Sequence, residues 1–115
     1  MPSPAPRHLA SPLAAIVLAT LLASACGGDG DAGVRIGMHD LQFDPRDATV
    51  RVGQSVEWTN DEDAPHKLAA TAGANLHSQT LGPDDTFTFT PNQVGTISYV
   101  CTLHPGMTAT LRVTE

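Results

Sequence analysis

The chain has 115 residues and a mass of 12.0 kDa, which is enough for one domain and too little for two hydrophobic cores. Hydrophobic residues make up 41% of it and charged residues 16%, a balance typical of a globular protein rather than of a disordered one. Six lysines and arginines stand against twelve aspartates and glutamates, which gives a formal net charge of −6. This charge argues against nucleic acid as a partner.

The first segment of the chain has the features of an export signal. An almost unbroken apolar run covers Leu13–Ala23; it is short for a transmembrane helix and typical of the hydrophobic region of a signal peptide. Small residues then precede Cys26, an arrangement that resembles the lipobox of bacterial lipoproteins. We therefore predict a signal peptide over residues 1–25 and a flexible tether over residues 26–33 that begins at a lipidated Cys26. Ordinary cleavage after Ala25, with an unmodified cysteine, is the alternative.

These features predict an exported protein, located in the periplasm or at the cell surface. Its contact with the membrane is expected to run only through the lipid on Cys26. Export also implies an oxidising compartment, in which a reduced thiol needs a reason to survive. The second cysteine of the chain, Cys101, lies in the predicted folded part and therefore needs a role that keeps it reduced.

The remaining residues, 34–115, read as one domain of short strands separated by turn residues. Apolar and polar residues alternate in five segments, namely 48–52, 55–59, 86–90, 95–101 and 109–113. No helical period persists beyond about one turn. The pattern predicts an all-β domain, a β-sandwich with Greek-key connections. We expect its core to contain Val50, Val52, Val56, Trp58, Phe87, Phe89, Ile97, Tyr99, Leu111 and Val113.

The residues that carry chemistry come late in this domain. Cys101, His104 and Met107 follow one another at a spacing of three, and His66 lies in a loop 35 residues before the cysteine. A thiolate, two imidazoles and a thioether are the ligand set of a type 1 copper site. The thiolate and the imidazoles suit both Cu(I) and Cu(II), whereas the weakly donating thioether favours Cu(I). We therefore predict one copper ion per chain, bound by these residues.

Roles for Cys101 that do not involve copper fit this pattern less well. A single buried cysteine is usually a small hydrophobic residue, but structural zinc has little use for a methionine, and c-type haem needs a C-x-x-C-H motif that Cys101 lacks. A disulfide between Cys26 and Cys101 would require the tether to reach the end of the sandwich.

His39 and His77 lie outside the motif. They are predicted to be surface residues, with a weak second metal site as the alternative.

At these residues the chain resembles the cupredoxins, the type 1 blue copper proteins, and among them the amicyanin and plastocyanin type. The resemblance covers about residues 34–115. It rests on the Cys-x-x-His-x-x-Met loop and on four further segments, residues 43–45, 52–60, 65–66 and 95–101. It implies an eight-stranded or similar sandwich with His66, Cys101, His104 and Met107 as copper ligands at one end.

The residue after the first ligand departs from the family pattern. In close relatives it is commonly an asparagine whose side chain braces the cysteine loop, whereas here it is Lys67, which cannot accept a hydrogen bond. The bracing is therefore expected to come from elsewhere, with Asn60 and Thr102 as candidates.

The ligand set predicts an electron carrier that cycles Cu(II) and Cu(I) outside the cytoplasmic membrane, rather than an enzyme. Redox proteins would be its partners, and the chain is expected to be a monomer. The alternative is a protein that stores or delivers copper through the same site.

Three acidic residues, Asp61, Glu62 and Asp63, come just before His66. They predict an acidic rim at the copper end that steers a basic partner; a merely solvated loop is the alternative.

Overall fold

The computed structural model describes residues 33–115. The predicted signal peptide and Cys26, with nearly all of the tether, lie outside the described residues. Within residues 33–115, no helix is long and apolar enough to cross a membrane. The described part contains the strands β1 (Val34–His39), β2 (Gln42–Asp44), β3 (Asp47–Arg51), β4 (Val56–Asn60), β5 (Leu68–Ala72), β6 (Thr86–Phe89), β7 (Gly95–Cys101) and β8 (Thr108–Thr114).

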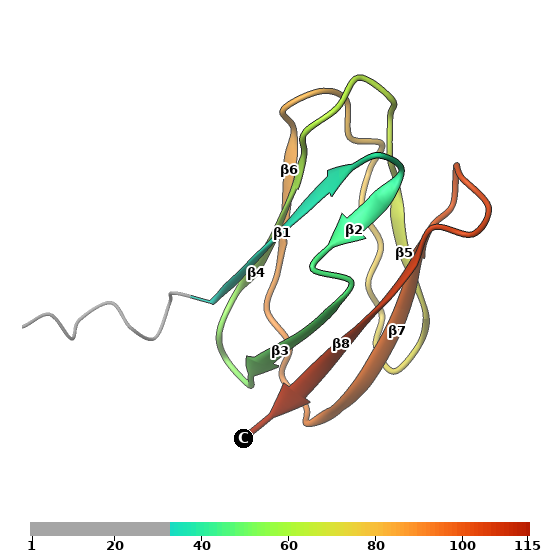
Figure 1. Ribbon diagram of the computed structural model, residues 1–115. Helices are drawn as coiled ribbons and strands as arrows, with labels where there is room; N and C mark the ends of the chain where they lie inside the picture. Colours follow the sequence, from blue (N-terminus) through green and yellow to red (C-terminus); the bar gives the residue numbers. More distant parts are fainter. Residues whose placement is uncertain (1–32) are drawn as a thin grey trace, which may run out of the picture.

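The strands form two sheets that pack face to face (Figure 1). One sheet has the order β2-β1-β4-β6 and the other the order β3-β8-β7-β5. The pairs β1–β4 and β3–β8 are parallel, and the other neighbours are antiparallel. The predicted all-β sandwich is therefore confirmed.

Strand β7 shows how the residue pattern places the cysteine. Ile97, Tyr99 and Cys101 are buried on one face of this strand, while the residues between them are partly exposed. Successive side chains of a strand point to opposite faces. The same alternation that builds the core therefore turns the thiol of Cys101 inward at the end of β7.

The two sheets are joined through aromatic side chains in the core. Trp58 on β4 donates its indole N–H to the hydroxyl oxygen of Tyr99 on β7 over 3.2 Å, and the two rings meet edge to face at 5.4 Å. Burial raises the pKa of Tyr99 to about 12, although the hydrogen bond from Trp58 acts to lower it. The phenol is therefore neutral over the physiological range.

Of the ten predicted core residues, seven are buried, two are half-buried and one is exposed. Val52 is 39% exposed, because β3 ends at Arg51 and the chain turns away from the sandwich there. Phe87 and Phe89 are half-buried, since β6 is the edge strand of its sheet. The buried hydrophobic residues outside the predicted set include Ile36, Met38, Phe43, Leu68, Leu76 and Leu81.

One end of the sandwich collects the loops that carry the predicted ligands. Strands β1, β4 and β7 end there, and β5, β6 and β8 begin there (Figure 1). Cys101 is the last residue of β7, His66 comes just before β5, and the β7–β8 loop contains His104. The topology therefore brings residues that are distant in the sequence to one end of the domain.

Candidate metal centre

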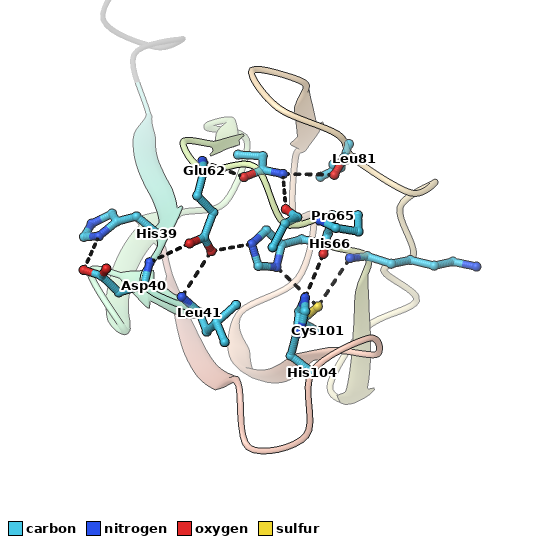
Figure 2. Close-up of polar contacts among 12 residues, drawn as sticks. His39, Asp40, Leu41, Glu62, Pro65, His66, Leu81, Cys101 and His104 are labelled. Carbon is cyan, nitrogen blue, oxygen red and sulfur yellow. Dashed lines mark hydrogen bonds and ion pairs between the residues drawn. The ribbon is translucent and has the colours of Figure 1, made fainter.

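Three of the four predicted ligands form a cluster at this end. The ligand atoms of His66, Cys101 and His104 all lie within 4.8 Å of one another. His66 is fully buried, Cys101 is 3% exposed and His104 is partly exposed. The sulfur of Cys101 lies 3.6 Å from Nδ1 of His66, as Figure 2 shows. Two imidazoles and one thiol at this separation fit a copper ion.

His66 is held from both its backbone and its ring. Its N–H donates to the carbonyl oxygen of Leu81 over 3.0 Å, and the N–H of Leu81 donates back over 2.7 Å. Nε2 of the ring lies 2.7 Å from a carboxylate oxygen of Glu62. Because an ionised carboxylate can only accept, Nε2 carries the proton. Nδ1 is then the acceptor nitrogen, and it faces the sulfur of Cys101.

His104 is oriented by a backbone carbonyl group. Its Nε2 lies 2.9 Å from the carbonyl oxygen of Pro65, which again can only accept. The ring therefore donates through Nε2, and Nδ1 is the nitrogen with the free lone pair. This contact also ties the β7–β8 loop to the loop that precedes His66 (Figure 2).

The cysteine loop is braced by the backbone of Lys67. The N–H of Lys67 donates to the sulfur of Cys101 over 3.4 Å, and its carbonyl oxygen accepts from the N–H of Thr102 over 2.8 Å. Thr102 thus contributes its backbone rather than its hydroxyl. Lys67 is exposed and braces the loop through its backbone, so the inability of its side chain to accept a hydrogen bond is of no consequence.

Asn60, the other predicted brace, stabilises the loop before His66. Its side-chain amide is fully buried and donates to the carbonyl oxygens of Ala64 and Leu81, over 2.8 and 3.0 Å. Its own amide oxygen accepts the N–H of Glu62 over 2.9 Å. Asn60 therefore fixes the shape of the segment that presents His66.

Met107 lies at the base of the same loop as His104. Its side chain is buried, with 3% of the residue exposed. Its N–H donates to the carbonyl oxygen of His104 over 3.1 Å, and its carbonyl oxygen accepts the N–H of Cys101 over 2.9 Å. These bonds close the loop between the cysteine and the methionine.

Glu62 is a residue of the site that the sequence did not reveal. Its carboxylate accepts from the backbone N–H groups of Asp40 and Leu41, over 2.9 and 3.1 Å, as well as from His66. Only 21% of its side chain is exposed. Burial opposes its charge, but the hydrogen bond from His66 and those from the two backbone groups hold the pKa of the carboxyl below its ordinary value.

The prediction that Glu62 belongs to an exposed acidic rim is therefore wrong, whereas Asp61 and Asp63 are exposed. The reason is local. The hydrogen bond from the N–H of Glu62 to Asn60 turns Glu62 inward, where the backbone N–H groups of Asp40 and Leu41 donate to its carboxylate. The sequence of three consecutive acidic residues does not indicate which of their side chains points inward.

The two histidines outside the motif stay outside the cluster. His39 lies between the carboxylates of Asp40 and Asp44, at 3.3 and 3.1 Å. Its pKa is raised by its hydrogen bonds to Asp40 and then to Asp44. His77 is exposed. Among residues 33–115, neither histidine belongs to a group that could hold a metal ion.

Known proteins with similar sequences include amicyanins and plastocyanins. Amicyanin-alpha of Methylorubrum extorquens is 31% identical over 71 residues, which are 58% of this chain and 60% of the relative. Amicyanin of Paracoccus denitrificans is 28% identical over 81 residues, 67% of this chain and 62% of the relative. Plastocyanin of Tetradesmus obliquus is 32% identical over 87 residues, 65% of this chain and 60% of the relative. The chain thus spans about three fifths of the length of the curated relatives it matches.

Solved structures and a family model agree with this similarity. A reduced Cu(I) form of an amicyanin variant superposes with a TM-score of 0.66 at 26% identity, over 72% of this chain and 83% of that chain. A copper-containing nitrite reductase from Thermus scotoductus also has a TM-score of 0.66, at 24% identity over 71% of this chain and 22% of that chain, which shows the shared fold alone. The model of the copper-binding proteins of the plastocyanin/azurin family matches residues 31–114. This match spans the domain that holds the cysteine and both histidines, and the chain belongs to this family of copper-binding cupredoxins.

Proposed function

We propose that this protein is a blue copper electron carrier that cycles one copper ion between Cu(II) and Cu(I). The observation that carries the proposal is the cluster of one thiol and two imidazoles within 4.8 Å, with hydrogen bonds fixing each member. Bound copper would supply the two oxidation states. Ligands held this firmly would move little when an electron arrives or leaves, which is what a carrier requires.

The proposed ligands are His66, Cys101, His104 and Met107. The buried position of Met107 in the loop that holds His104 supports the assignment of its thioether as the weak axial ligand. His104 is the partly exposed member of the set, so its ring edge is the proposed route for the electron to a partner.

The hydrogen bonds of the Glu62 carboxylate support carrier function rather than enzymatic activity. Among residues 33–115, Glu62 is the carboxylate in contact with a proposed ligand, and both of its oxygens already accept hydrogen bonds. We therefore assign it a structural role beside the proposed ligand rather than that of a general base. We assign the protein no catalytic residues.

We propose further that the protein works outside the cytoplasmic membrane, in the periplasm or at the cell surface. Support comes from the signal-like segment at residues 1–25 and from the lipobox-like residues before Cys26. The domain would work as a monomer on a lipid tether and exchange electrons with redox partner proteins.

The test is the visible spectrum of the oxidised, copper-loaded full chain, together with its voltammetry. An intense blue band from thiolate-to-copper charge transfer is expected, with a reversible one-electron wave. Cys101→Ser should lose the band because a hydroxyl is a hard ligand, whereas the control Met107→Leu should keep it and shift the potential upward. A blue band that survives in Cys101→Ser would contradict the site. If the protein shows no reversible redox wave but transfers Cu(I) readily to an acceptor, copper storage or delivery is favoured instead.

A further inference from the structure

Glu62 links a surface turn to a buried copper ligand. The turn between β1 and β2 contains Asp40 and Leu41, whose N–H groups donate to different oxygens of the Glu62 carboxylate. The oxygen that accepts from Leu41 also accepts from Nε2 of His66 over 2.7 Å. Figure 2 shows the carboxylate between the turn and the ring. Three donors thus converge on two oxygens.

Only a carboxylate satisfies all of these donors. Each carboxylate oxygen can accept, whereas a glutamine in the same place offers one accepting oxygen and one NH₂ group that donates. An NH₂ group would then face at least one N–H, because donors approach both oxygens. The site therefore requires the charged side chain, and a shorter or neutral one leaves a donor without a partner.

The turn itself is shaped around this carboxylate. Asp40 and Leu41 both have positive φ values, 55° and 57°, a conformation that costs energy for residues other than glycine. In this conformation their successive N–H groups point to one side and form a concave anion site. On the opposite side, the buried amide of Asn60 holds the backbone N–H of Glu62. The carboxylate is therefore fixed from both directions.

We propose that Glu62 is a positioning residue that locks His66 in the tautomer with the proton on Nε2. A neutral imidazole has one donor nitrogen and one acceptor nitrogen. With Nε2 committed to the carboxylate, Nδ1 presents its lone pair toward the sulfur of Cys101, 3.6 Å away. The opposite tautomer would carry a proton at Nδ1, where a metal must bind. The negative charge beside the ring also favours the more highly charged, oxidised site, a consequence that rests on the proposed function.

The test measures the tautomer directly in the metal-free full chain by long-range ¹H–¹⁵N NMR. The measurement is made at roughly pH 8, above the ordinary imidazole pKa of about 6.5. The native chain should show His66 as a single Nε2–H tautomer, Glu62→Ala should show a mixture, and Glu62→Gln should lie between them. The matched controls are Glu57→Ala and Glu57→Gln, since Glu57 pairs with Arg35 on the strands and touches none of the ligands. The control variants should match the native chain.

Copper binding and potential provide the second readout. Loss of a group that orients a metal ligand typically costs about 10- to 100-fold in metal affinity, so Glu62→Ala should bind copper at least about tenfold more weakly than Glu57→Ala. Glu62→Gln should have a higher potential than Glu57→Gln.

A single Nε2–H tautomer in Glu62→Ala, with copper affinity equal to that of its control, would overturn the proposal. If the alanine variant does not fold, an unchanged tautomer and potential in Glu62→Gln overturn it equally. Because the tautomer is read without copper, the result does not depend on whether the protein carries electrons.

Discussion

Around the proposed ligands, most of the positioning is done by backbone groups. The carbonyl of Pro65 orients His104, the backbone of Lys67 braces Cys101 and Thr102, and Leu81 holds the backbone of His66. Backbone contacts do not depend on side-chain identity, so they leave no trace in a sequence. For this reason the ligand set could be predicted from residue types and spacing while the bracing could not. Glu62 was missed for the related reason that its role depends on where the Asp40–Leu41 turn folds.

His39 gives a prediction at the scale of one residue. Because Asp40 and Asp44 raise its pKa, its protonation stabilises the fold, fully so below the unfolded value of about 6.5. This contribution is lost as the pH rises through the raised folded value. The free energy of unfolding of His39→Gln should therefore converge with that of the native chain as the pH rises. An NMR titration of the reduced protein should place the pKa of His39 above its ordinary value and show it lower in Asp44→Asn; equal values in the two proteins would contradict the account.

At the scale of elements, the residue alternation identified the strands that have a clear apolar face. The predicted segments correspond to β3, β4, β6, β7 and β8, with small shifts at their ends. The other strands lack the signal: β2 has three residues, and β5 is alanine-rich with an irregular register between Ala70 and Ala72. In β1 a glycine interrupts the pattern, and a Cβ at Gly37 would lie 2.7 Å from a carboxylate oxygen of Asp61. Packing in three dimensions, rather than local pattern, places these strands.

The contact between β4 and β7 gives a prediction at this scale. Tyr99→Phe removes the acceptor for the indole N–H of Trp58, which is fully buried. An unpaired buried donor costs about 1–3 kcal/mol, so urea unfolding should show a loss of stability of that size. Thr71→Val is the control, because Thr71 donates an exposed hydroxyl to Ser98 and surface changes usually stay within about 0.5 kcal/mol. Equal stability of the two variants would show that the bond between the sheets is unimportant.

Over the whole domain, the charges are unevenly distributed along the long direction of the sandwich, with more acidic than basic residues at the copper end. Exposed carboxylates gather at the copper end, where Asp61 bonds the end of β1, Asp84 bonds the end of β4 and Asp63 lies in the loop before His66. Among residues 33–115, no lysine or arginine forms an ion pair with them. Arg35, Arg51 and Arg112 lie at strand ends away from the copper end, whereas Lys67 follows His66 and Arg46 bonds Thr108 at the start of β8, both near the copper end. This arrangement favours approach of a basic partner to the copper end.

This asymmetry predicts a salt-dependent association rate with a cationic redox protein such as a basic cytochrome c. Stopped-flow rates should fall as salt rises, because salt screens the attraction between the exposed charges. The double variant Asp61→Asn/Asp63→Asn should flatten this dependence. Glu57→Gln/Glu115→Gln removes the same formal charge away from the copper end and should flatten it less. If both double variants respond to salt alike, net charge rather than its placement is responsible.

The way in which Lys67 braces the cysteine has a practical consequence. Its backbone forms the bracing hydrogen bonds while the residue is exposed to solvent, and it is the one lysine in the chain. Its amine is therefore a unique side-chain handle for conjugation, next to His66 and outside the cluster. A fluorophore attached there would sit close enough to the chromophore for energy transfer into the blue band of the oxidised state, and its emission would recover on reduction. The position that departs from the family pattern thus offers an optical reporter of the oxidation state without a change to any ligand.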